Sequence, residues 1–154
     1  MKSQPLILLA LVMFFSCETG TVPDTAKKNG LPITGTWQLF SGTLIEKGDT
    51  VVTDYTKNVS FIKIINDTHF AFLQHDLNKG KDSAASFSSG GGKYSLKDTL
   101  YTEHLEYCNA REWEGHDFSF GITISNDTLI QRGVEIVESA GVNRINIEKY
   151  TRIK

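Results

Sequence analysis

The chain has 154 residues, of which 40% are hydrophobic, and this is enough for one globular domain with its own core. It contains 16 basic and 18 acidic residues, which give a formal net charge of −2. This mildly acidic balance excludes nucleic acid as a partner, because nucleic-acid binding requires a strongly basic surface.

The first residues have the pattern of a signal peptide. Lys2 supplies a basic start, an unbroken apolar run follows from Leu6 to Phe15, and Ser16 is a small residue before the expected cut. Apolar runs of about 7 to 15 residues are typical of exported precursors, whereas a bilayer span takes about 20. We expect residues 1–16 to be removed, which takes away Lys2 and leaves a net charge of −3. The alternative is a short anchor that is never cut.

The cysteine that follows the expected cut predicts a lipid anchor. The segment 14–17, Phe-Phe-Ser-Cys, resembles a lipobox, with phenylalanine where leucine is commonest. The resemblance implies that Cys17 is diacylated and becomes the first residue of a lipoprotein in the cell envelope. Each buried lipid CH₂ contributes about 0.8 kcal/mol, so two or more chains anchor stably. Cys108 then has no partner in the chain, and we expect a small buried residue there rather than a reactive thiol.

The segment between this cysteine and the folded domain is predicted to be a tether. Residues 17–33 are rich in threonine, lysine, glycine and proline and show no apolar periodicity. Such a composition does not bury enough surface to fold alone. We therefore expect one folded domain over residues 34–154, which this tether connects to the membrane.

The domain is predicted to consist entirely of strands. β-branched and aromatic residues dominate, and no stretch keeps helical spacing for three turns. Consecutive hairpins make an antiparallel up-and-down meander, and about eight to ten strands avoid exposed edges by closing into a barrel. The alternative is an open two-sheet sandwich. The expected strands span Gly35–Glu46, Thr50–Tyr55, Val59–Ile65, His69–Gln74, Ser86–Leu96, Leu100–Tyr107, Asp117–Ser125, Leu129–Glu138 and Val142–Ile153.

A recurring Asp-Thr pair predicts the hairpin tips. It occurs at residues 49–50, 67–68, 98–99 and 127–128, each time before an apolar or aromatic segment. Aspartate favours tight turns because its side chain accepts hydrogen bonds from nearby backbone N–H groups, and threonine favours strands.

The two ends of the domain resemble the calycins, the lipocalins and fatty-acid-binding proteins. Gly35-Thr36-Trp37 opens the first strand, and Tyr150-Thr151-Arg152 closes the last. The resemblance implies a barrel in which Arg152 lies across the Trp37 indole and closes one end. Fatty-acid-binding proteins hold a ligand carboxylate with an arginine two residues before the late tyrosine. Glu148 occupies that place here, so we expect a neutral or cationic group rather than a fatty acid.

A glycine run supports a narrower resemblance. Residues 88–94, Ser-Ser-Gly-Gly-Gly-Lys-Tyr, followed by Tyr-Thr-Glu at 101–103, resemble lipocalin-like proteins common in Bacteroidetes, many of them lipoproteins. The run has neither the Lys-Ser/Thr ending nor the helix of a phosphate loop. We expect it to let a strand bend or bulge at a barrel corner.

Side-chain alternation selects candidate ligand residues. Tyr101, Glu103, Leu105 and Tyr107 are expected to share one face, and we select the two tyrosines and Glu103 as lining. Glu103 would be a carboxylate among aromatic rings, where its pKa is raised or it accepts a ligand donor; the alternative is a paired or solvated carboxylate.

The last strand adds further candidates. Glu148 and Tyr150 share a face with Arg152, and with Arg144 and Asn146. If that face points inward, the isoleucines at 145, 147 and 153 point outward, and the alternation leaves this conflict open.

These features predict a lipid-anchored envelope protein that binds a small, partly apolar molecule. No cofactor or metal is expected, because the histidines at 69, 75, 104 and 116 lack close ligand spacing. No nucleophile elbow or paired catalytic signature indicates an enzyme. The alternative is a filled barrel whose loop 108–117, with Trp113 exposed, binds another envelope protein; in the competing arrangement Trp113 folds over the barrel mouth.

Overall fold

A computed structural model describes residues 30–81 and 83–154. The expected signal peptide, Cys17 and most of the tether lie outside the described residues. In the described part, no helix has the length and apolar character needed to cross a membrane. The strands are β1 (Gly35–Glu46), β2 (Asp49–Asp54), β3 (Val59–Ile65), β4 (His69–Asp76), β5 (Phe87–Lys97), β6 (Leu100–Cys108), β7 (Asp117–Ser125), β8 (Thr128–Val137) and β9 (Val142–Arg152), with short 3-10 helices η1 (Arg111–Trp113) and η2 (Glu138–Ala140).

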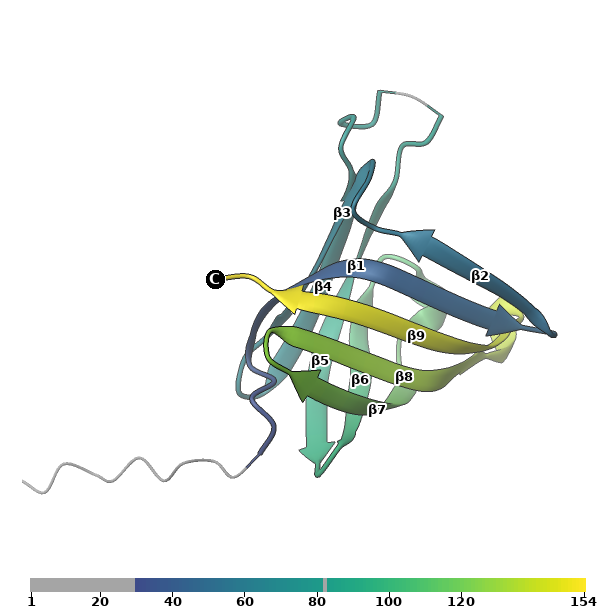
Figure 1. Cartoon of the computed structure of the whole chain (residues 1–154). Helices are drawn as coiled ribbons and strands as arrows, with labels where there is room; N and C mark the ends of the chain where they lie inside the picture. The colour runs from purple at the N-terminus through teal and green to yellow at the C-terminus, as the bar shows by residue number, and fades with distance from the viewer. Residues whose placement is uncertain (1–29, 82) are drawn as a thin grey trace, which may run out of the picture.

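The strands form one antiparallel sheet that closes into a barrel (Figure 1). The order β1-β3-β4-β5-β6-β7-β8-β9 returns to β1 through pairing of β1 with β9. β2 lies outside this ring and pairs only with the second half of β1, from residue 41 onward. The fold class predicted from the sequence, an all-β up-and-down barrel, is therefore confirmed, with eight strands in the ring. It is the architecture that the resemblance to lipocalin-like proteins implies.

The two ends of the barrel have different structures. Since the strands alternate in direction, the turns β3–β4, β5–β6 and β7–β8 all lie at the end where β1 begins and β9 ends. The β1–β2 hairpin, η1 and η2 lie at the opposite end. All four Asp-Thr pairs stand at hairpin tips, as predicted. In the β3–β4 turn, however, Asn66 and not Asp67 accepts from the Thr68 and His69 N–H groups, at 2.9 and 2.8 Å.

The first of these ends is closed by the stacking that the resemblance implies. The Arg152 guanidinium carbon lies 4.0 Å from the centre of the Trp37 ring, and the indole is fully buried. The guanidinium also donates to the Pro32 and Thr34 carbonyls, at 2.5 and 2.7 Å. Gly35 has a φ of +138°, and a Cβ there would lie 2.5 Å from the Arg152 Nη1 atom. Glycine before this tryptophan therefore makes room for the arginine.

The last residues before the predicted domain, at 31–33, contact the barrel core. Ile33 is 3% exposed and lies in the main core, and Leu31 packs against that core. The Trp37 indole N–H donates to the Ile33 carbonyl at 2.7 Å. Residues 31–33 thus pack on the barrel and cover the apolar layer at the closed end.

The glycine run lies where two strands approach closely, as expected. A Cβ on Gly91 or Gly92 would meet the Phe70 or His104 carbonyl oxygen at 2.5 or 2.0 Å. Between these glycines the register with β6 shifts, because β6 contains one additional residue, Glu106. This β-bulge reverses the alternation of side chains beyond it.

The bulge corrects the prediction that Tyr107 shares a face with Tyr101, Glu103 and Leu105. Those three are buried, at 0, 7 and 4% exposure, whereas Tyr107 is 68% exposed on the outer surface. Strict alternation of side chains fails here because β6 contains the bulge. Cys108 takes the inward place instead.

Candidate functional site

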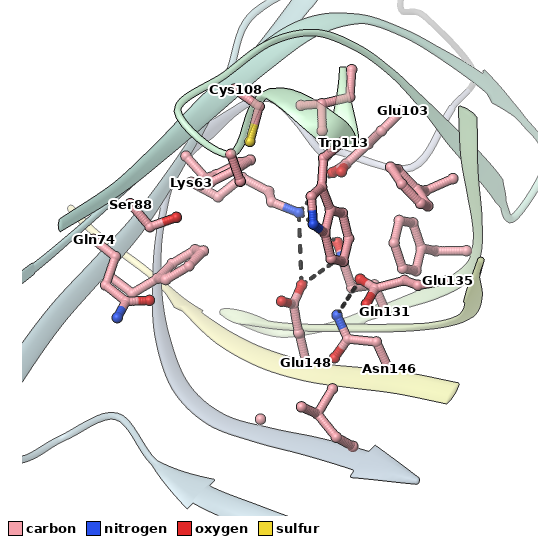
Figure 2. A pocket seen from close by; sticks show the side chains of 18 of the residues that line it. Lys63, Gln74, Ser88, Glu103, Cys108, Trp113, Gln131, Glu135, Asn146 and Glu148 are labelled. Atoms are coloured by element: carbon pink, nitrogen blue, oxygen red, sulfur yellow. Dashed lines mark hydrogen bonds and ion pairs between the residues drawn. The ribbon is translucent and has the colours of Figure 1, made fainter. Parts of the chain in front are cut away.

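The barrel contains a cavity of about 360 Å³ that reaches from its centre toward the end carrying η1 and the β1–β2 hairpin (Figure 2). Its walls combine aromatic rings with charged and amide groups. The lining residues are Gly42, Leu44, Thr53, Tyr55, Phe61, Lys63, Phe72, Gln74, Ser88, Glu103, Leu105, Cys108, Ala110, Trp113, Phe118, Phe120, Gln131, Glu135, Arg144, Asn146 and Glu148.

The inner part of this cavity is organised by a buried lysine. Lys63 is only 2% exposed, and its ammonium nitrogen lies 2.7 Å from Glu103 Oε1 and 3.1 Å from Gln131 Oε1. It comes from β3, whereas these two partners come from β6 and β8. A buried ammonium requires such partners, because loss of hydration costs several kcal/mol per ion.

Aromatic rings surround the same ammonium group. The centres of Phe70, Tyr101, Phe120 and Tyr150 lie 5.9, 6.0, 5.9 and 5.3 Å from the Lys63 nitrogen. Rings attract a cation through the negative charge of their faces, and the attraction is stronger where water is absent. The interior is thus suited to positive charge on two counts, its carboxylates and its rings.

Glu148 links this cluster to the cavity. Its Oε2 atom accepts from the Gln131 amide and the Tyr150 hydroxyl, both at 2.6 Å, and lies 3.8 Å from the Lys63 nitrogen. Figure 2 shows Glu148 and Asn146 reaching from β9 into the cavity. The face of β9 that carries these residues therefore points inward, which resolves the conflict left by the sequence. Ile153 is 45% exposed on the other side.

A second charged group lies nearer the mouth. Glu135 accepts from the Arg144 guanidinium and from the Asn146 amide, both at 2.7 Å. The Arg144 guanidinium carbon also lies 5.3 Å from the centre of the Trp113 ring. The half-buried Trp113 packs on Phe118, with ring centres 5.6 Å apart. Of the two arrangements weighed for Trp113, the structure has the one in which the ring lies over the mouth.

Burial and charge act in opposite directions on the pKa values of the central pair. Burial raises the pKa of the Glu103 carboxyl group above its ordinary value, although Lys63 opposes this. Burial alone would lower the pKa of Lys63, but the charges of Glu103, Glu148 and Glu135 outweigh it, so the pKa is raised. The raised pKa favours the ammonium form of Lys63 at neutral pH.

The two buried tyrosines of the cluster differ in their hydrogen bonding. The Tyr150 hydroxyl donates to Glu148, whereas the buried Tyr101 hydroxyl, on the Glu103 side of the cluster, has no hydrogen-bond partner among the described residues. Burial raises the pKa of both phenols above the ordinary value of 10.0. Both are neutral at physiological pH.

The residues selected from the sequence fall into three groups. Glu103 and Glu148 line the cavity. Tyr101 and Tyr150 lie in the fully buried core beside the charged cluster and are not part of the cavity wall. Tyr107 lies on the outer surface, in a shallow groove over the glycine run. Their roles toward a ligand stay predictions.

Sequence reasoning missed Lys63 and Gln131. A signal for Lys63 was present, because alternation places it on the same face as Phe61 and Ile65 within β3. A lysine between two apolar residues of one face indicates a buried cation. Gln131 follows an apolar segment of β8 and carries no comparable signal.

Loop 108–117 contributes to the cavity wall near the mouth. Cys108 is half-buried and lines the cavity, and its backbone N–H donates to Glu114 at 2.9 Å. No cluster of three potential metal ligands occurs among the described residues. A protein partner at this loop stays a prediction.

Known proteins resemble the chain at the level of structure. It is similar to a lipocalin-like protein from Bacteroides uniformis, with 16% identity, a TM-score of 0.47 and coverage of 78% of this chain and 97% of that chain. It is also similar to an uncharacterized protein from Bacteroides eggerthii, with 12% identity, a TM-score of 0.45 and coverage of 78% and 98%. No protein-family model and no curated protein matches the chain. The fold class stands on this chain's own strand order and barrel closure.

Replacement of Lys63 tests the charged cluster. Lys63→Met leaves Glu103 buried without its cation, so we expect the free energy of unfolding to fall by about 3 to 5 kcal/mol in urea denaturation. The double variant Lys63→Met/Glu103→Met removes both charges and should recover more than half of that loss. Lys93→Met is the control, because its exposed ammonium lies 3.8 Å from Glu106 and should change stability by less than about 0.5 kcal/mol. Equal losses in the single and double variants would contradict this account.

The tyrosines provide a matched pair. Tyr101→Phe removes a hydroxyl without a partner and should leave stability unchanged or raise it by up to about 1 kcal/mol. Tyr150→Phe removes a donor to a carboxylate and should cost about 1.5 to 3 kcal/mol. Because burial raises both pKa values, the unfolded chain ionises first, and wild-type stability should fall as pH rises above about 10. In each variant, stability should decrease less steeply above this pH than in the wild type. Urea denaturation at neutral and alkaline pH measures both the cost of each substitution and its pH dependence. An equal cost for the two variants at neutral pH refutes the assigned difference.

Proposed function

We propose that this protein is a lipid-anchored protein of the bacterial cell envelope that binds a small, partly apolar molecule inside its barrel. The observation that carries the binding part is the cavity of about 360 Å³. Ligand pockets range from about 300 to 1,000 Å³ and combine apolar walls with a few polar groups, so this cavity suits a small organic molecule.

The composition of the walls supports this proposal. Phe61 and Phe72 are stacked, with ring centres 5.8 Å apart, and Tyr55 meets Phe61 edge-on at 5.9 Å. These rings form an apolar wall, while Glu148 and Gln131 provide polar groups deeper in the barrel. A ligand with an apolar body and one polar end matches this division.

The anchoring part of the proposal rests on the sequence before the described residues. The basic start, the apolar run and Ser16-Cys17 together favour export, cleavage and acylation of the cysteine. The membrane would then hold the barrel at the envelope, in the outer membrane with the domain facing the periplasm or the cell surface.

Dye binding tests the cavity. The uncharged fluorescent probe N-phenylnaphthylamine should bind wild-type protein saturably and brighten on entering the barrel. Ser88→Phe places a ring in the cavity and should lower probe affinity by about tenfold or more. The neighbouring Ser89→Phe lies in the outer groove and is the control, with wild-type affinity expected. Binding that is unaffected by Ser88→Phe, or lost only in Ser89→Phe, would place the probe outside the barrel and contradict the proposal.

The two cysteines provide the test of the anchor. In bacteria fed labelled palmitate, the wild-type protein should carry the label and sediment with membranes, and Cys17→Ser should lose the label. Cys108→Ser should keep it, because only the cysteine after the cut receives lipid. Label that persists in Cys17→Ser refutes the anchor and leaves the binding proposal untouched.

A further inference from the structure

We infer that the cavity selects a ligand carrying a protonated amine, with Glu148 as the carboxylate that contacts it. This inference rests on the proposed function, because it names the chemical class of the molecule that the barrel would hold. Three features of the described residues support it: the charge balance, an unused carboxylate oxygen and the aromatic wall.

Among the charged residues that line the cavity, Glu148 is the carboxylate without a cation of its own. The cavity is lined by three carboxylates and two cations. Lys63 has its close partner in Glu103 and Arg144 has its own in Glu135, each pair at 2.7 Å. Glu148 has no cation of the described residues within 3.5 Å, because its nearest, Lys63, lies 3.8 Å away and is already bound. A half-buried carboxylate without its own cation is unfavourable, and a cationic ligand would stabilise it.

The hydrogen bonds of Glu148 leave one of its oxygens available. Gln131, Tyr150 and Lys63 all approach Oε2. No described residue donates a hydrogen bond to Oε1, and the side chain is 15% exposed within a wall of the cavity. The carboxylate is therefore held in place through Oε2, by hydrogen bonds from two neutral donors with Lys63 farther away, and presents Oε1 to a donor from outside. An ammonium group is such a donor, and its charge strengthens the bond.

The aromatic wall also favours a cation over an anion. Both interior cations already lie against rings, Lys63 among four and Arg144 over Trp113. Tyr55, Phe61 and Phe72 line the remaining space and present further rings to a ligand. Ring faces attract cations and repel anions.

Arg144 offers the competing arrangement. Its Nε atom is bound to Glu135, and no described residue accepts a hydrogen bond from its terminal nitrogens. An anionic ligand would bind there, near the mouth. The Glu135 carboxylate neutralises this guanidinium at 2.7 Å, which weakens the attraction for a second anion.

Competition among three matched ligands tests the inference. Octylamine, octanol and octanoate share one apolar chain and differ in the charge of the head group. Each is titrated at neutral pH against N-phenylnaphthylamine bound to the full folded domain. We expect octylamine to displace the probe at a concentration about tenfold or more below that of octanol, and octanoate to be the weakest. Octanol equal to octylamine, or octanoate the strongest, overturns the inference while the binding proposal stands.

Variants of Glu148 locate the preference. Glu148→Gln keeps the shape and the acceptor for Gln131 but removes the charge, so the preference for octylamine over octanol should fall to within about twofold. Glu148→Asp retains the charge and should keep most of the preference, and Glu148→Asn, which has the same length as aspartate without the charge, takes the place of Glu148→Gln if that variant does not fold. Glu106→Gln removes an outer carboxylate and is the control. A preference that survives in Glu148→Gln refutes the assigned role, whereas a probe that fails to enter wild-type protein refutes the proposed function itself.

Discussion

Burial of the Lys63 ammonium is the constraint on which the interior depends. A cation 2% exposed to solvent requires carboxylate and amide partners at hydrogen-bond distance. Glu103 and Gln131 supply them from the far wall, and their own remaining groups then need partners. The Gln131 amide donates to Glu148, and the Tyr150 hydroxyl donates to the same carboxylate oxygen. A polar layer thus crosses the barrel between the apolar plug at the closed end and the cavity.

The polar layer gives the cavity its chemical character. Below it, the stack of Trp37 and Arg152 closes this end of the barrel interior. Above it, the aromatic walls and Trp113 surround a space of about 360 Å³. The Glu148 side chain is 15% exposed and lies among protein groups, so its charge acts more strongly on a ligand there than it would in bulk water. The proposed anchor and the cavity would together suit a protein that retains a small molecule at a membrane surface.

Much of the fold was predictable because its signals are local. The predicted bounds of β1, β3 and β7 coincide with those observed, since alternation and turn residues within a few positions decide where a strand begins and ends. The bulge at Glu106 was not predictable in detail, although the glycine run opposite indicated an irregularity. One additional residue reversed the faces beyond it and moved Tyr107 outside.

By itself, the sequence determined the strands, the turns, the barrel class and the expectation of a lipid anchor at Cys17. Only part of the candidate site was predicted from the sequence. The prediction included Glu103 and Glu148 but not Lys63 and Gln131. Only the tertiary structure decided which charges meet. Lys63 finds partners 40 and 68 residues away, and they become neighbours because the sheet curls until opposite walls face each other. Alternation along a strand assigns a side chain to one face of the sheet. Closure of the barrel and the register between strands decide which groups lie opposite that side chain, and those groups determine its charge state and its role.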